Sequence, residues 1–183
     1  MKQYLLGIDV GTTGTKTLLL STDGIVLGHA YRPYAIENPA VGFSEQRAQD
    51  WWKAVIETVH EVCEKLPAGR KVAAISLSLQ GGTIVPVDEN MEPLRNAIVW
   101  NDGRCAKQFI EFQEAGGSDQ YAYERSGWHM NSGLPALQVR WIRDNEPEIF
   151  ARTSLFLSVP DYISMKMTGI PAAAPVSISA ILR

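Results

Sequence analysis

The sequence has few cysteines, little excess charge and no long hydrophobic run. Its 183 residues include two cysteines, Cys63 and Cys105, which lack the C-x-x-C spacing of metal and redox sites. We therefore expect both thiols to behave as small buried hydrophobic groups rather than as a disulfide. A formal net charge of −3 at pH 7 argues against nucleic acids and anionic membranes as partners, because both select a basic protein surface.

The N-terminus lacks the features of a secretion signal or a membrane anchor. A single lysine, Lys2, precedes a short apolar segment that soon meets Asp9. A signal peptide or a membrane span needs a longer apolar run. The sequence therefore predicts a cytoplasmic protein, and its 45% of hydrophobic residues can bury the core of one ordinary domain.

Residues 5–20 carry the motif on which we base the functional interpretation. They are typical of two apolar strands joined by a turn of glycine and threonine. The glycines allow backbone dihedrals closed to other residues, so that main-chain N–H groups can face an anion; the threonines add hydroxyls and a lysine adds positive charge. The candidate phosphate-binding residues are Gly11, Thr12, Thr13, Gly14 and Lys16. Asp9 is the candidate metal ligand, since Mg²⁺ prefers carboxylate oxygens beside substrate phosphates.

Two better-known glycine motifs do not fit this stretch. A Walker loop places lysine directly after glycine, but Thr15 stands between Gly14 and Lys16. A dinucleotide fingerprint opens a helix, whereas the β-branched and aliphatic residues 15–20 favour a strand. An ordinary hairpin with a Gly-Thr turn remains the alternative.

The periodicity of the chain predicts a sheet that opens with a three-stranded meander over residues 3–31. A helix over 48–66 follows, with Trp51 and Trp52 more typical of core packing than of ligand stacking. A buried strand over 72–79 should then pair in parallel, because a helix connects it to the meander. The remaining predicted elements are strands at 84–87, 98–100 and 155–158, a turn at 147–151, and helices at 104–114, 118–126, 135–144 and 160–167.

The string D-V-G-T-T-G-T-K at residues 9–16 resembles the first phosphate motif of the FGGY carbohydrate kinases, which are actin-like sugar kinases. Further strings resemble the xylulose kinase branch in the same order, and the resemblance covers nearly the whole chain. These strings are Ser44-Glu45-Gln46, Asp50-Trp51-Trp52, the W-N-D-G-R run Trp100–Arg104, Pro160-Asp161-Tyr162 and Met167-Thr168-Gly169. The resemblance implies an α/β fold of the actin-like ATPase or ribonuclease H-like class, with a mixed sheet flanked by helices.

The resemblance also implies a function. Residues 1–183 would be the N-terminal domain of an ATP-dependent carbohydrate kinase, which transfers the terminal phosphoryl group of ATP to a hydroxyl of a ketose or related sugar. ATP with Mg²⁺ and a small sugar would be the ligands. A homodimeric assembly is left as an open alternative. The implied sugar-binding residues are Gln80, Gly81, Gly82, Asn101, Asp102 and Arg104. Asp102 could also cap the helix that follows it.

Two departures from the family pattern carry predictions. Gly81 and Gly82 stand where xylulose kinases have Met-His, so the imidazole that would bond a sugar hydroxyl is missing. We expect the two glycines to leave room for a bulkier acceptor. The chain also ends at Arg183, before the second domain that carries the family's adenosine pocket and its aspartate general base. We therefore expect no catalytic base in this chain and no turnover by the chain alone.

Two other functions stay open from the sequence. One is a different actin-like ATPase, which would share the opening hairpin but has no reason to carry W-N-D-G-R. The other is a shortened, non-catalytic sugar- or phosphate-binding module.

His129 has no ligand partner in view, so it is expected at the surface or in a structural role. The apolar residues 170–179 stand where the family is acidic and polar.

Overall fold

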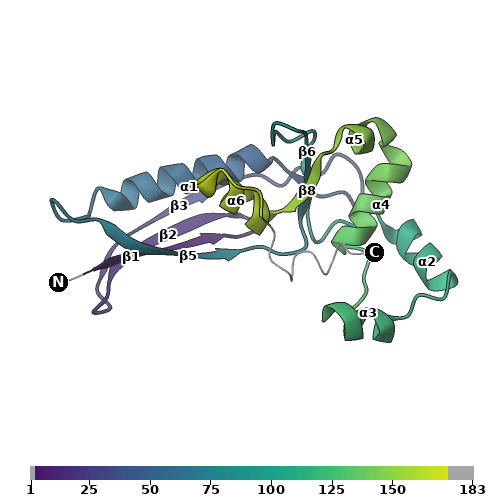
Figure 1. The fold of residues 1–183 in the computed structure, drawn as a ribbon, viewed down its shortest axis with the longest axis horizontal. Helices are drawn as coiled ribbons and strands as arrows, with labels where there is room; N and C mark the ends of the chain where they lie inside the picture. Colours follow the sequence, from purple (N-terminus) through teal and green to yellow (C-terminus); the bar gives the residue numbers. More distant parts are fainter. Residues whose placement is uncertain (1–2, 173–183) are drawn as a thin grey trace. The chain divides into compact units, whose positions relative to one another are not determined.

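The computed structural model describes residues 3–172, which form two compact units. The first unit contains the chain up to Ala35 together with Gln49–Gln80, and the second contains Ile36–Ala48 and the chain from Gly81 onward. Figure 1 shows the chain as a ribbon and labels most of its helices and strands. Most of the predicted departure at 170–179 lies outside the described residues.

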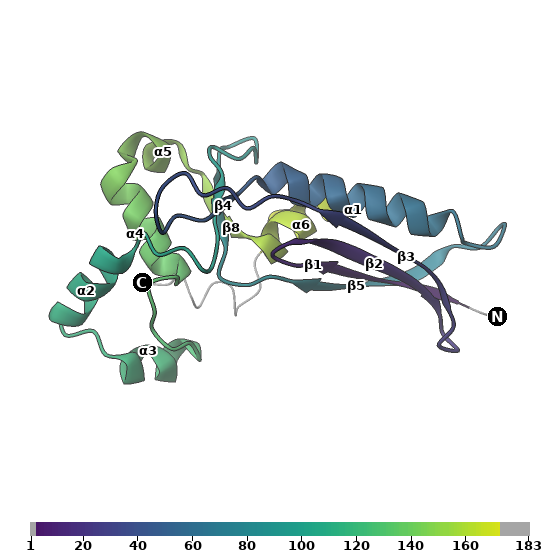
Figure 2. The same ribbon diagram turned by 180° about the vertical axis from the view of Figure 1, so that it is seen from behind.

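The first unit is a four-stranded mixed sheet in the order β3-β2-β1-β5. Strands β1 (Tyr4–Val10), β2 (Gly14–Ser21) and β3 (Val26–Pro33) form the predicted antiparallel meander. Strand β5 (Val72–Leu79) pairs in parallel with β1, as predicted, because helix α1 (Ala48–Cys63) makes the crossover between β3 and β5. Figure 2 shows α1 running along the strands of this sheet.

One face of the first sheet packs on α1. Tyr4, Leu6 and Leu19 are buried there with Val62 of the helix. Because side chains alternate across a strand, this burial directs the intervening residues of β1 and β2 to the opposite face. A buried hydrogen bond of 2.7 Å between the hydroxyls of Thr17 and Thr58 joins β2 to α1. Trp51 is fully buried, which confirms its predicted core role, while Trp52 is half-buried.

The prediction that β5 is buried was wrong. Residues 73–76 are exposed, and in the described part of the chain β5 lies at the edge of its sheet. A continuous apolar run is typical of a strand covered on both faces, and the pattern alone does not say which segment covers it. The helix before β5 also ends earlier than predicted, at Cys63 rather than Leu66, although Leu66 still packs on the core.

The second unit contains a four-stranded antiparallel sheet in the order β4-β7-β6-β8. Its strands are β4 (Glu45–Gln46), β6 (Ile84–Val87), β7 (Ala97–Ile98) and β8 (Leu155–Ser158). Its helices are α2 (Ala106–Glu114), α3 (Asp119–Ser126), α4 (Pro135–Asn145), α5 (Pro147–Arg152) and α6 (Val159–Thr168). Helix α5 replaces the predicted turn. Ile84, Ile98 and Ile142 form a buried core in which α4 packs on β6 and β7.

Both cysteines are free thiols, as predicted. Cys105 is fully buried, and burial raises the pKa of its thiol to about 12. Cys63 is half-buried, and burial again raises its thiol pKa. Within residues 3–172 no helix is both long and apolar enough to span a bilayer.

Helix α6 begins with a capping box, which explains the P-D-Y string. The Ser158 hydroxyl accepts from the Asp161 N–H, and the Asp161 carboxylate accepts from the Ser158 N–H at 3.0 Å. The Ser158 hydroxyl also donates to this carboxylate at 2.5 Å. At the other end, Gly169 has φ +74°, a left-handed conformation that favours glycine. Asp161 therefore stabilises the helix start, as the sequence predicted.

Replacing Ser158 with alanine should destabilise the protein by about 1–2 kcal/mol, because the buried Asp161 carboxylate and the first turn of α6 both lose a partner. Ser164→Ala in the middle of the same helix should have little effect, since alanine is the better helix former. Urea unfolding of both variants measures the difference. Equal midpoints would show that the capping box contributes nothing.

Candidate active site

The β1–β2 hairpin places an acid and a base opposite each other. Asp9 on β1 pairs with Lys16 on β2, and cross-strand partners share one face of a sheet. Both side chains are exposed, whereas the flanking Val10 and Thr15 are buried on the α1 side. The candidate metal ligand and the candidate phosphate-binding lysine therefore project from the same face, next to the Gly-Thr turn.

The turn requires glycine, but for a different reason than the backbone dihedrals that the sequence suggested. Neither Gly11 nor Gly14 has a positive φ, so neither is needed for a left-handed conformation. Gly14 is needed for close approach, because a Cβ there would lie 2.5 Å from the Tyr31 hydroxyl and 2.6 Å from the Arg32 carbonyl oxygen. The Gly11 N–H donates to the Gly14 carbonyl at 3.1 Å and closes the turn.

Gln80 lies beside this turn in the first unit. Its N–H donates to the Val10 carbonyl at 3.0 Å, and Asp9 is opposite Ser78 in the parallel register of β1 and β5. The carboxyl ends of β1 and β5 thus meet, and this is where α/β folds bind ligands. Residues 3–172 contain no group of three or more His, Cys, Asp or Glu suited to a metal. A single carboxylate such as Asp9 still fits Mg²⁺, which usually takes one or two carboxylates together with substrate phosphates.

In the second unit, the two glycines lie between tryptophans. Gly82 has φ +74°, and a Cβ there would lie 2.9 Å from the Trp100 Cβ. A Cβ on Gly81 would lie 3.8 Å from the Trp128 ring. The expected empty volume is therefore absent at Gly82, because Trp100 fills it. The position of Trp128 next to Gly81 was not predicted, since a tryptophan in a loop carries no spacing signal.

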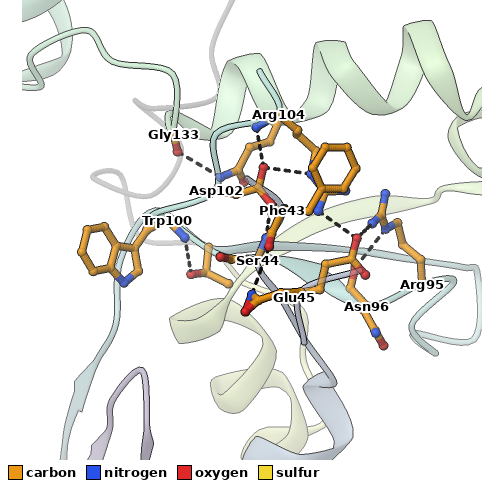
Figure 3. A network of polar contacts seen from close by, with 12 residues as sticks. Phe43, Ser44, Glu45, Arg95, Asn96, Trp100, Asp102, Arg104 and Gly133 are labelled. Atoms are coloured by element: carbon orange, nitrogen blue, oxygen red, sulfur yellow. Dashed lines mark hydrogen bonds and ion pairs between the residues drawn. The ribbon is translucent and has the colours of Figure 1, made fainter. Parts of the chain in front are cut away.

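The backbone around Gly82 is held by two polar side chains. Gln138 Nε2 donates to the carbonyls of Gly82 at 3.1 Å and Gly133 at 2.9 Å. The Trp100 N–H donates to the Thr83 hydroxyl at 3.2 Å. The Trp100 side chain remains half exposed, and Figure 3 shows its ring pointing away from the neighbouring ionic network. The second unit thus brings Gly82 and the start of the W-N-D-G-R run together.

Asp102 and Arg104 form the centre of that network (Figure 3). Their side chains are 0% and 1% exposed. Asp102 Oδ1 accepts from Arg104 Nε at 2.9 Å, and Oδ2 accepts from Arg104 Nη2 at 2.8 Å and from the Ser44 N–H at 2.6 Å. Arg104 Nη2 also donates to Glu45 Oε1 at 2.8 Å. One buried guanidinium therefore joins the W-N-D-G-R run to Glu45 of β4.

The network continues outward from Glu45. Arg95 pairs with Glu45, and its Nη1 donates to both Glu146 carboxylate oxygens at 2.7 Å. The Arg104 guanidinium lies over the Phe43 ring at 4.0 Å from its centroid. Burial alone would lower the pKa of Arg104, but its hydrogen bonds and charge interactions with Asp102 and Glu45 outweigh burial and raise the pKa. Arg104 therefore stays charged.

Residues 4–180 match the model of the FGGY family of carbohydrate kinases, N-terminal domain. The chain belongs to this family. It is 32% identical to a xylulose kinase of Bacillus subtilis over 169 residues, which cover 92% of this chain and 34% of that protein. It is 29% identical to a gluconokinase of Bacillus licheniformis, over 91% of this chain and 32% of that protein. The chain thus spans about a third of the curated relatives it matches.

Solved structures agree with this FGGY assignment. A gluconate kinase from Lactobacillus acidophilus superposes with a TM-score of 0.90 at 25% identity, covering 99% of this chain and 36% of that one. A ligand-bound xylulose kinase from the same organism also has a TM-score of 0.90 at 25% identity, covering 98% and 36%. The fold is the actin-like, ribonuclease H-like α/β fold that the sequence predicted.

In this FGGY domain, Asp102 is not the cap of the helix that follows. The residue before α2 is Cys105, and no side chain caps that helix. Both Asp102 oxygens bond Arg104, and Oδ2 also bonds the Ser44 N–H. Asn101, by contrast, is exposed beside Trp100. Direct sugar contact by Asn101 stays a prediction, and the burial of Asp102 and Arg104 favours a role in holding the Trp100-Asn101 segment.

His129 has a partner that the sequence did not reveal. Its Nδ1 lies 2.8 Å from Asp119 Oδ2, and its ring stacks on Tyr123 with centroids 4.5 Å apart. The hydrogen bonds from His129 and from the Met130 N–H lower the pKa of Asp119. His129 is exposed, which confirms the predicted surface position.

Arg104→Ala should destabilise the protein by about 3–5 kcal/mol, because it leaves Asp102 buried without its cation. Arg143→Ala should change stability little, since Arg143 pairs with Asp144 at the surface. Urea unfolding followed by tryptophan fluorescence measures both, and Trp141 reports directly because its ring lies against Arg104. Similar losses for the two variants would contradict a structural role for the buried network.

Proposed function

We propose that this chain is the N-terminal kinase domain of an ATP-dependent sugar kinase, which transfers the terminal phosphoryl group of ATP to a hydroxyl of a ketose or related sugar. The observation that carries the proposal is the β1–β2 hairpin. Asp9 and Lys16 face each other on its exposed side, next to a Gly-Thr turn and beside Gln80. Membership of the FGGY family supports the reaction class.

Each hairpin residue has a distinct part in this proposal. Thr12, Thr13 and Gly14 bind phosphate oxygens through main-chain N–H groups and hydroxyls, and Lys16 adds a positive charge. Gly11 acts by closing the turn, because its N–H donates to the Gly14 carbonyl. Asp9 holds Mg²⁺, which when bound neutralises the charge that develops on the transferred phosphoryl group. Phosphoryl transfer needs little covalent help from a protein, so positioning and charge stabilisation provide most of the catalysis.

The acceptor sugar is assigned to the second unit. Gly81 is exposed and leaves its main chain accessible to a ligand, whereas Trp100 packs on Gly82. The indoles of Trp100 and Trp128 provide apolar surface for the C–H groups of a sugar. Asn101 can donate to and accept from neighbouring hydroxyls. Asp102 and Arg104 act indirectly, by holding the segment that carries Trp100 and Asn101.

The test is a coupled assay of sugar-dependent ADP release by the complete protein that contains this chain. A panel of ketoses, aldoses and polyols should include at least one acceptor that releases ADP and gains a phosphate, detected by mass spectrometry. ADP release without a phosphorylated sugar would indicate another ATPase. Sugar or nucleotide binding without any ADP release would indicate a non-catalytic module.

Asp9→Asn in the complete enzyme should lower the turnover number by about 100-fold or more, because a metal ion contributes several kcal/mol of charge stabilisation. The sugar KM should change little, since the carboxylate serves the metal and not the acceptor. Asp23→Asn, in the turn between β2 and β3, is the matched control and should keep normal kinetics. A normal turnover number with a raised sugar KM would reject the assignment of Asp9.

Xylulose should not be the best substrate of the complete enzyme. Without an imidazole at 81–82 it loses a hydrogen bond worth on the order of 1–2 kcal/mol, or roughly 5- to 30-fold in kcat/KM. Gly82→His is not expected to restore it, because the positive φ and the Trp100 Cβ oppose any side chain at this position. Comparison of kcat/KM across the sugar panel measures the preference. A tenfold lead for xylulose would contradict the prediction.

A further inference from the structure

The carbonyl groups of the phosphate turn are held by protein donors. The carbonyls of Gly11, Thr13 and Gly14 each have such a donor. The Gly14 carbonyl accepts from the Gly11 N–H at 3.1 Å, which closes the turn. The Gly11 and Thr13 carbonyls accept from residues at the end of β3 and just beyond it.

Two tyrosines provide these donors. The Tyr34 hydroxyl donates to the Gly11 carbonyl at 2.6 Å, and the Tyr34 N–H donates to the Thr13 carbonyl at 3.3 Å. The Tyr31 hydroxyl donates to the same Thr13 carbonyl at 3.1 Å. Tyr31 reaches it only because Gly14 has no side chain, since a Cβ there would lie 2.5 Å from the phenol oxygen. The close approach at Gly14 and the tyrosine contacts thus belong to one arrangement.

Holding a carbonyl also orients the next N–H. The peptide bonds of the described chain are trans, and in a trans peptide the C=O and N–H of one plane point in opposite directions. When Tyr34 holds the Gly11 carbonyl, it also sets the direction of the Thr12 N–H. A carbonyl oxygen turned toward a phosphate would repel it, whereas N–H groups attract it. The tyrosines therefore help to set the orientation of the main-chain N–H groups, which is what a phosphate-binding turn requires.

The Tyr34 phenol is suited to act as a permanent donor. It is half-buried, and burial together with the nearby Asp9 carboxylate raises its pKa to about 12. The hydroxyl therefore keeps its proton throughout the physiological pH range.

We propose that Tyr34 and Tyr31 are positioning residues of the phosphate site: their hydroxyls hold the Gly11 and Thr13 carbonyls and so keep the turn in its phosphate-binding conformation. This inference rests on the proposed function. Tyr34 has the larger part, because its hydrogen bond is shorter and less exposed than that of Tyr31. Neither tyrosine needs to touch the nucleotide.

The experiment compares Tyr34→Phe, Tyr31→Phe and a control, Tyr4→Phe, in the complete protein. Tyr4 is a buried tyrosine of β1 at the opposite end of the hairpin from the turn. Binding of ATP, ADP, adenosine and the accepted sugar is measured by calorimetry, with kinetics alongside. One lost hydrogen bond corresponds to a factor of about 2–10 in affinity. Tyr34→Phe should weaken ATP and ADP binding by this factor, and Tyr31→Phe by less.

Adenosine separates phosphate positioning from a general structural effect. It has no phosphate, so its affinity and that of the sugar should stay unchanged in both variants, and Tyr4→Phe should leave all four ligands unaffected. Equal losses for ATP and adenosine, or unchanged ATP binding by a folded Tyr34→Phe, would overturn the inference. If Tyr34→Phe does not fold, the variant of the exposed Tyr31 provides the test. In that case Tyr31→Phe must weaken the binding of ATP and leave the binding of adenosine unchanged. Failure of the wild-type protein to bind ATP would instead reject the proposed function.

Discussion

The alternation of side chains in the β1–β2 hairpin is the constraint on which the proposed phosphate site depends. Ile8 and Val10 are buried on the side of the sheet that packs on α1, and the period of a strand then directs Asp9 to the opposite face. The antiparallel register brings Lys16 to the same place. A slip of one residue would bury the acid and expose the valine, so the free energy that forms the core also selects the register of the site.

The second unit depends on a different interaction, the buried charge of Arg104. Removing a guanidinium and two carboxylates from water is costly, so such a cluster is stable only when its hydrogen bonds are well made. Here Arg104 bonds Asp102 and Glu45 and also stacks on Phe43. The same charges would be poorly satisfied in another arrangement of the Ser44 and Trp100 segments. We infer that the network holds the Trp100-Asn101 segment in one position.

Gly14 and Gly82 show why the spacing of a motif predicts where a site lies better than it predicts the role of each residue. Gly14 was attributed to backbone freedom, yet the structure explains it by the close approach of Tyr31. Gly82 was expected to leave an open volume, yet Trp100 fills it. In both places the decisive neighbour is about 17 or 18 residues away in sequence, on another strand or loop. Local patterns carry no information on such contacts.

The sequence by itself determined the meander, the parallel crossover strand, helix α6 and the position of the Gly-Thr turn between β1 and β2. These features follow from short-range rules: the period of side chains, hairpin and capping residues, and the length of a crossover. Only the tertiary structure decided that β5 lies exposed at an edge, that Asp102 pairs with Arg104 instead of capping α2, and that Tyr34 holds the turn. Each of these depends on which distant groups share a desolvated space, and burial and charge pairing are set by the folded neighbourhood and not by spacing along the chain.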